Sequence, residues 1–177
     1  MSSDLGTKYL VDANILISAC RKFYAFDIAP VFWKLIASHL GVDLFILDKV
    51  QVELAGEDSL AQWLDKQYAR VPACLISTND SSIVSSYQEI MQYVSKCGYY
   101  NPVGQQSWQD YTAADPWLVA TAMAEGYTLI TFEKPNNNLS TNRKSKSIKI
   151  PDVANYFGVR CIDLFEYMRR QKICFEK

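Results

Sequence analysis

Short apolar runs of β-forming residues alternate with segments of helical period along this 177-residue chain. The runs that predict strands are Tyr9–Val11, Leu44–Leu47, 74–76, 127–131 and 160–162. Strands separated by a helix pair in parallel through right-handed crossovers, which place helices on both faces of the sheet. We therefore expect an α/β fold with three layers, α/β/α, around a central, mainly parallel sheet of four or five strands.

The helices between these strands are predicted from apolar periodicity and from start and stop residues. One begins near Asn14, and one follows Asp48, which has capping-box spacing to Gln51. The others are expected at 30–40, around 63–68, at 83–94, 115–125 and 151–157, and after Asp163. The stretch 99–107 contains Pro102 and Gly104 and is predicted to be a loop.

The length is that of one globular domain, so we expect residues 1–177 to form a single domain. A composition of 49% hydrophobic and 21% charged residues excludes a disordered chain. No apolar run reaches the roughly 18 residues of a membrane helix, and the first apolar stretch lacks the layout of a signal peptide. Five scattered cysteines without a C-x-x-C pair are expected to be reduced, so we predict a cytoplasmic protein.

The sequence contains a single histidine, His39. This excludes every metal site that needs two or more imidazole ligands, so a bound metal must be held by oxygen atoms. His39 lies near the end of a predicted helix, and we expect its role to be structural.

Four acidic residues are predicted to lie at the carboxyl ends of the strands, where open parallel sheets bind ligands. Asp12 ends the first strand, Glu53 lies on the helix after the second, Asp115 opens a later helix, and Glu133 follows the fourth strand. Burying an ionised Asp12 among apolar residues is unfavourable unless a cation pairs with it. Each acid also has a simpler explanation, as a helix cap or as an exposed surface residue. Together they predict a site for a hard cation, Mg²⁺ or Mn²⁺.

The segments around these acids are Val11-Asp12-Ala13-Asn14, Val52-Glu53-Leu54, Ala114-Asp115-Pro116-Trp117-Leu118 and Leu129-Ile130-Thr131-Phe132-Glu133. They resemble the PIN-domain family of metal-dependent nucleases, and the similarity extends from Tyr9 to about Phe165. The resemblance implies a PIN-like fold and an endoribonuclease similar to the VapC-type toxins of bacterial toxin–antitoxin pairs. It implies RNA as substrate, Mg²⁺ or Mn²⁺ as cofactor, and an antitoxin or a second copy of the chain as protein partner.

The resemblance also implies a set of site residues. Asp12, Asp115 and Glu133 would ligate the metal, and Glu53 would ligate it directly or through water. Asn14 and Thr131 would support the acids by hydrogen bonds. The chain departs from the family pattern in having Glu133 where many members have aspartate, and in the long basic insertion that follows. Two further acids, Asp110 and Asp152, are available to supplement the set.

The residue types fit phosphodiester hydrolysis, because attack by metal-activated water needs no covalent protein nucleophile. A haloacid-dehalogenase-like phosphatase is disfavoured, since that chemistry expects a second aspartate at the position of Asn14. A non-catalytic PIN-like module that binds RNA or another protein stays open as the alternative.

The segment 134–149 combines five basic residues with asparagine and serine and contains no acid. We expect a mobile basic loop that contacts RNA phosphates or is merely a solvated insertion. A chain with net charge −1 has no general attraction to nucleic acid, so phosphate contacts must come from a local patch. The residues of this patch are Lys134, Arg143, Lys144, Lys146 and Lys149.

Overall fold

The computed structural model describes residues 6–56 and 58–175, and the other positions of the predicted 1–177 domain lie outside the described residues. The described strands form a five-stranded sheet in the order β3-β2-β1-β4-β5, with every neighbouring pair parallel. The strands are β1 (Tyr9–Val11), β2 (Leu44–Leu47), β3 (Leu75–Ile76), β4 (Thr128–Ile130) and β5 (Cys161–Ile162). The predicted α/β class, the parallel sheet and the positions of its strands are confirmed.

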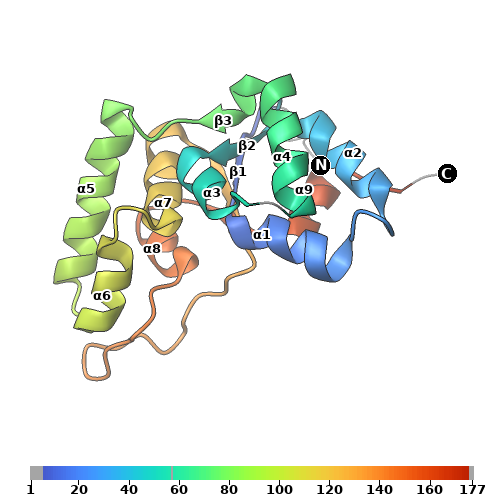
Figure 1. The fold of residues 1–177 in the computed structure, drawn as a ribbon. Coiled ribbons are helices and arrows are strands. Elements are labelled where there is room, and N and C mark those ends of the chain that lie inside the picture. The colour runs from blue at the N-terminus through green and yellow to red at the C-terminus, as the bar shows by residue number, and fades with distance from the viewer. Residues whose placement is uncertain (1–5, 57, 176–177) are drawn as a thin grey trace.

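Helices lie on both sides of this sheet. Figure 1 shows α5, α6, α7 and α8 to one side of the strands and α1, α2, α4 and α9 to the other, which is the predicted layered arrangement. The described α-helices are α1 (Ala13–Ser18), α2 (Pro30–His39), α3 (Asp48–Glu53), α4 (Ser59–Arg70), α5 (Ser81–Lys96), α6 (Pro102–Gln109), α7 (Ala114–Glu125), α8 (Ile150–Tyr156) and α9 (Leu164–Arg170). A π-helical turn, η1 (Ala19–Phe23), follows α1, and a 3-10 turn, η2 (Pro72–Cys74), precedes β3.

The core is built around strands that are buried on both faces, as parallel sheets usually are. Every residue of β1, β2 and β4 is buried. Helix α7 is buried along most of its length and packs extensively against α5. The ring of Trp117 in α7 stacks on that of Tyr87 in α5, with 3.9 Å between ring centroids. This packing fixes the first turn of α7, which carries Asp115.

The prediction of a loop at 99–107 is wrong, because α6 occupies most of it. Asn101 caps this helix, its side chain accepting a hydrogen bond from Gly104 N at 3.0 Å, and Pro102 takes the first helical position, where no N–H is needed. Gly104 is buried where a β-carbon would come within 3.1 Å of the Ser145 carbonyl oxygen. The proline therefore starts a helix, and the glycine permits a close contact with another segment.

The predicted capping box at Asp48 is also wrong. Asp48 is the first residue of α3, and its side chain makes no capping bond to that helix. Its Oδ2 instead accepts hydrogen bonds from Thr78 N at 2.8 Å and Thr78 Oγ1 at 3.0 Å. Asp48 therefore ties α3 to the segment after β3.

The loop 134–149 contains no helix or strand and is held at both ends. Near its start, Asn136 N donates to Asp152 Oδ1 at 2.7 Å. Near its end, Ser145 N donates to the Tyr99 carbonyl at 2.8 Å, and Asn101 N donates to the Ser145 carbonyl at 2.9 Å. The basic loop is thus fixed to α8 and to the connection between α5 and α6.

His39 has a partner of its own outside the predicted site, and the cysteines form no disulfide. His39 Nδ1 is 2.7 Å from Asp43 Oδ1, and Asp43 Oδ2 accepts a hydrogen bond from the buried Tyr167 hydroxyl at 3.2 Å, which supports a structural role. All five cysteines are free thiols. In residues 6–56 and 58–175, no helix is long and apolar enough to cross a membrane.

Candidate functional site

Asp12 links the end of β1 to the end of β4. The parallel register pairs Val11 with Ile130, so the residues that follow these two strands lie side by side. Thr131 Oγ1 donates to Asp12 Oδ2 at 2.9 Å, and Asn14 N donates to Asp12 Oδ1 at 3.4 Å. Asp12 is therefore the N-cap of α1, which is the simpler explanation of this residue, but the hydrogen bond from Asn14 N is long. Its second oxygen, Oδ2, accepts the hydrogen bond from Thr131 at the end of the neighbouring strand, and Asp12 is 3% exposed.

The two supporting residues behave differently. Thr131 is buried and bridges two acids, because its hydroxyl donates to Asp12 and accepts a hydrogen bond from Glu133 N at 3.1 Å. Asn14 contacts Asp12 only through its backbone N–H, and its side chain is exposed. The structure thus gives Thr131 a side-chain role at the site and Asn14 a backbone role.

Glu133 is not a solvent-facing loop residue. Its Oε1 accepts from Lys149 Nζ at 2.7 Å, and its Oε2 accepts from Ile150 N, in the first turn of α8, at 2.8 Å. The side chain of Glu133 is 20% exposed. Lys149, which the sequence analysis assigns to RNA binding, thus forms an ion pair with one of the predicted site acids. Sequence spacing offers no signal for this pair, since the two residues lie at opposite ends of the loop.

Glu53 is exposed, yet it makes a tertiary contact with the helix that carries Asp115. It is the last residue of α3, and its Oε1 accepts a hydrogen bond from Ala114 N at 3.1 Å. Ala114 is the first residue of α7, so Glu53 satisfies one of the free N–H groups at the start of that helix. Glu53 and Asp115 are thereby brought to the same end of α7.

Asp115 lies in the first turn of α7 and does not cap it. The N-cap residue of α7 is Ala113, and the side chain that accepts a hydrogen bond from Ala114 N is that of Glu53, so the simple explanation of Asp115 as a cap is wrong. Burial raises the pKa of Asp115 to about 7, and the charges of Asp12, Glu133 and Glu53 add to this effect. The charge of Lys149 acts in the opposite direction and lowers this pKa.

The pKa of Asp12 is also raised, to about 6. Burial is the main cause, the hydrogen bonds from Thr131 and Asn14 oppose it, and the charges of Glu133 and Glu53 add to it. Asp12, Glu53, Asp115 and Glu133 are therefore close enough to repel one another, and we call these four residues the acidic cluster.

In the arrangement seen here, the acidic cluster is not a closed set of metal ligands. Among the described residues, no three His, Cys, Asp or Glu side chains are placed to hold one ion together. The reason is visible in the hydrogen bonds: Glu133 is turned toward Lys149 and Ile150, and Glu53 is turned toward Ala114.

Asp12 and Asp115 nevertheless fit a hard cation. They are carboxylates whose charge is disfavoured by burial and mutual repulsion, and no hydrogen bond from a described residue contributes to the pKa of Asp115. Mg²⁺ is commonly held by one or two carboxylates, with water and substrate phosphate completing its coordination. Two such acids are sufficient for this mode of binding.

Of the two further acids, Asp152 borders the cluster and Asp110 does not join it. Burial raises the pKa of Asp152, and the charge of Glu133 contributes to the shift. Its Oδ1 holds Asn136 N, and its buried Oδ2 has no partner in the described part of the chain. Asp110 is exposed and accepts two hydrogen bonds from Thr112, which lower its pKa.

These pKa shifts predict how the free energy of unfolding depends on pH without metal. The pKa values of Asp12 and Asp115 rise from 3.8 to about 6 and about 7. Between pH 3.8 and about pH 7, the folded protein therefore binds more protons than the unfolded chain. Stability is then greatest below the unfolded pKa and falls as pH rises through about 7. Asp115→Asn should be more stable than wild type by on the order of 2 kcal/mol at about pH 8, with the difference vanishing near pH 4.

Urea unfolding in the presence of a chelator measures this difference. Asp110→Asn is the matched control, because the pKa of Asp110 is lowered and its neutralisation should bring no gain at high pH. An Asp115→Asn protein less stable than wild type at about pH 8 would contradict the expectation that the Asp115 charge is poorly compensated.

Over residues 9–175 the chain matches the family described as a domain of unknown function, DUF4411. A search of curated proteins finds no match. Among solved structures, the chain is similar to one described as the crystal structure of VapBC2 from Rickettsia felis bound to a DNA fragment from their promoter. The sequence identity is 15% and the TM-score 0.48, with 89% of this chain and 98% of that chain covered. Because the family match takes in nearly the whole sequence, the chain belongs to DUF4411.

Proposed function

We propose that this protein is a metal-dependent endoribonuclease of the PIN type, which hydrolyses RNA phosphodiester bonds. The main support for the proposal is the acidic cluster at the carboxyl ends of the parallel strands. Two of its members, Asp12 and Asp115, have raised pKa values because burial and neighbouring acids disfavour their charged forms. Such shifts, caused by burial together with specific charged neighbours, are typical of functional sites.

The metal would be Mg²⁺ or Mn²⁺, held by Asp12 and Asp115. Glu133 and Glu53 would join as ligands on leaving their present partners, or act through water. When bound, the cation would supply activation of water and stabilisation of negative charge on the phosphate. The donor set consists of carboxylates, which suits a hard cation better than zinc or copper.

The chain's own residues set up this site. Thr131 fixes one oxygen of Asp12, which orients the other carboxylate oxygen at the start of α1. Glu53 holds the first N–H of α7, and this anchors the turn that carries Asp115. The amino terminus of α7 carries partial positive charge, which would favour both the carboxylates and an incoming phosphate. Lys149 offsets part of the negative charge through Glu133.

The basic loop would bind the RNA backbone. Arg143, Lys144 and Lys146 are exposed, and the loop on which they lie starts and ends beside the acidic cluster. Lys134 Nζ lies 3.9 Å from Asp163 Oδ2 at the surface, a weak contact that an RNA phosphate can replace. Lys149 is paired with Glu133, so it would influence the charge of the acidic cluster rather than contact the RNA backbone.

The resemblance of the sequence to PIN-domain toxins also suggests a biological role for the nuclease. We propose that the protein is the toxin of a toxin–antitoxin pair, that it acts on RNA in the cytoplasm, and that it binds an antitoxin or a second copy of itself. The nuclease proposal stands independently of this extension, since it rests on the acidic cluster.

A second candidate is a non-catalytic PIN-like module that binds RNA or protein. The observation that favours it is the ion pair between Lys149 and Glu133, at 2.7 Å, which places a cationic group beside the acids without any metal. In this alternative, Lys149 permanently neutralises part of the cluster. The two candidates differ in whether the acids are needed for RNA cleavage.

Cleavage of single-stranded RNA by purified protein tests this difference. With Mg²⁺ or Mn²⁺, Asp12→Asn and Asp115→Asn should each lose at least about a hundredfold in rate, because each removes a carboxylate that holds the cation. Asp110→Asn should retain the wild-type rate, since Asp110 lies outside the cluster, and a chelator should abolish cleavage. RNA binding without cleavage by wild type would decide for the non-catalytic module.

Replacement of Arg143, Lys144 and Lys146 by alanine tests the basic loop. RNA binding should weaken, and the salt dependence of the binding constant should flatten by up to about two units of log-log slope, since each lost phosphate contact removes about 0.7 on a single strand. Fluorescence anisotropy over a range of salt concentrations measures both. A control with Lys22, Lys66 and Arg169 replaced has the same change in charge at exposed positions elsewhere. An equal effect of the two triple variants would leave the basic loop without a specific role.

A further inference from the structure

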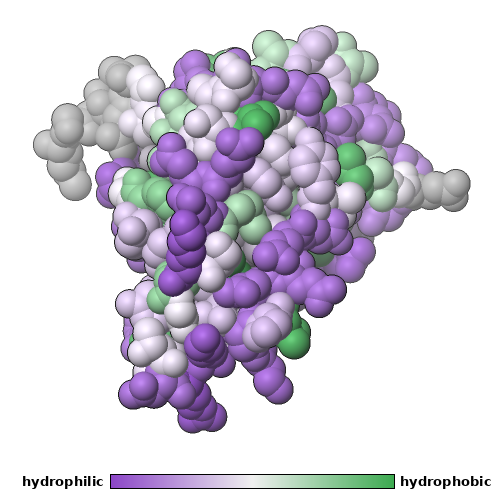
Figure 2. Space-filling view, turned by 90° about the vertical axis from the view of Figure 1, so that its left-hand side faces the viewer, coloured by the Kyte–Doolittle hydropathy of each residue, from purple (hydrophilic) through white to green (hydrophobic). Residues whose placement is uncertain are grey.

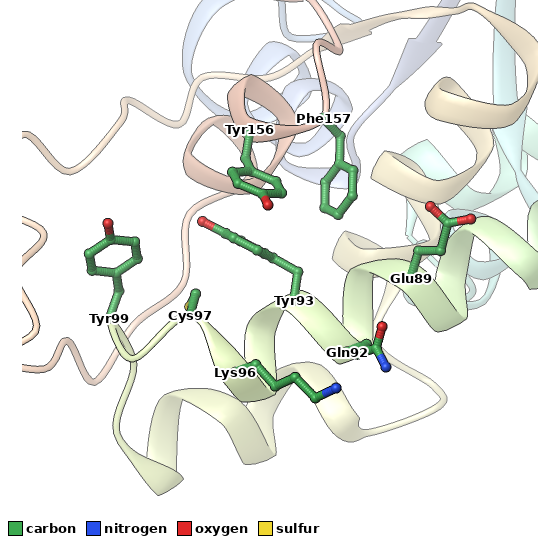
Figure 3. A pocket seen from close by; sticks show the side chains of 8 residues that line it. All are labelled: Glu89, Gln92, Tyr93, Lys96, Cys97, Tyr99, Tyr156 and Phe157. Carbon is green, nitrogen blue, oxygen red and sulfur yellow. The ribbon is translucent and has the colours of Figure 1, made fainter.

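A cavity of about 670 Å³ lies between the second half of α5 and the end of α8. Figure 3 shows Tyr93 and Lys96 projecting from α5, and Tyr156 and Phe157 projecting from the end of α8. The rings of Tyr93 and Tyr156 are stacked, with 3.9 Å between centroids and 21° between planes. Phe157 meets Tyr93 edge-on at 5.5 Å. We call this cavity the tyrosine pocket.

The tyrosine pocket presents an aromatic ring to solvent. Tyr156 is 64% exposed although one face of its ring packs on Tyr93. A large, exposed aromatic ring held by a second ring is a rigid platform for flat ligands. Stacking of a nucleobase on such a ring is worth enough to affect affinity, and it tolerates any base because each has an aromatic face.

Positive charge adjoins this platform. Lys96 lines the pocket itself, as does one acid, Glu89, so the excess of positive charge comes from the basic loop. The basic loop is fixed to the pocket's rim, since Ser145 N donates to the carbonyl of Tyr99, which also lines the pocket. Figure 2 views the side of the molecule that carries α5 and α6, and hydrophilic residues dominate it, with apolar residues scattered. This surface suits a charged, wet ligand better than a broad apolar protein interface.

Helix α8 connects the tyrosine pocket to the acidic cluster. At its start, Ile150 N donates to Glu133, and at its end, Tyr156 lines the pocket. A helix of seven residues is about 10 Å long. A strand of RNA that passes the acidic cluster can therefore reach the pocket within a few nucleotides.

We propose that the tyrosine pocket binds an unpaired nucleobase of single-stranded RNA, a few nucleotides from the phosphate at the acidic cluster, by stacking on Tyr156. The basic loop binds the adjoining phosphates. This inference rests on the proposed function, because it assumes that RNA is the ligand of the acidic cluster.

The test is the affinity of a short fluorescent single-stranded RNA, measured by anisotropy in the presence of a chelator so that it is not cleaved. Tyr156→Ala should weaken binding about tenfold, and Tyr156→Phe should bind like wild type because it keeps the ring. Phe175→Ala is the matched control, since Phe175 is 49% exposed and packs on Tyr24, away from the pocket. It should leave the affinity unchanged.

A series of RNAs with one abasic nucleotide at each position gives a second readout that does not depend on a variant. With wild type, affinity should fall about tenfold at one position only, and Tyr156→Ala should abolish this dependence on position. Equal affinity of Tyr156→Ala and wild type, or no sensitive position with wild type, would overturn the assignment and leave the pocket to another ligand, such as a protein segment. Failure of wild type to bind any RNA would overturn the proposed function as well.

Discussion

Burial of the carboxylates of Asp12 and Asp115, to which the repulsion of neighbouring acids adds, is the constraint on which the rest of this structure depends. The parallel register of β1 and β4 brings Asp12 beside Thr131, and the docking of α7 brings Asp115 into the electrostatic range of Asp12. Burial and repulsion both disfavour their charged forms, so the fold must hold them by other contacts. The stacking of Trp117 on Tyr87 and the bond from Ala114 N to Glu53 are such contacts. Stability given up in this way is typical of functional sites.

Lys149 joins the acidic cluster to the basic loop, which is the surface that would bind RNA. It ends the basic loop, precedes α8 and pairs with Glu133 at 2.7 Å. Because α8 then leads to Tyr156, one continuous segment of chain joins Glu133 of the acidic cluster, the basic loop and Tyr156 of the tyrosine pocket. A ligand that contacts all three would be an extended, negatively charged strand with flat groups, which is a description of single-stranded RNA.

Local patterns in the sequence were sufficient for the sheet and for the position of the acids, and insufficient for their contacts. The apolar run at 9–11 and the acid after it predict Asp12 at a strand end because strand period and burial are local properties. The pairing of Glu133 with Lys149 depends on how the basic loop returns to the sheet, which no local pattern contains. Asp48 also depends on a distant contact, because its side chain binds Thr78 instead of capping α3 as predicted. In α6, Gly104 predicted a loop, but its role is a close contact with the Ser145 carbonyl, which no local pattern contains.

We propose that Asp12 and Asp115 bind a divalent cation, and titration calorimetry with Mn²⁺ tests this most directly. At about pH 7, wild type should bind Mn²⁺ and release a fraction of a proton, because the cation favours the charged forms of two acids with raised pKa values. Buffers of different ionisation enthalpy measure that proton release. The Asp12→Asn and Asp115→Asn double variant should lose both the binding and the proton release. Equal Mn²⁺ binding by wild type and the double variant, or no binding by wild type at millimolar Mn²⁺, would contradict the account.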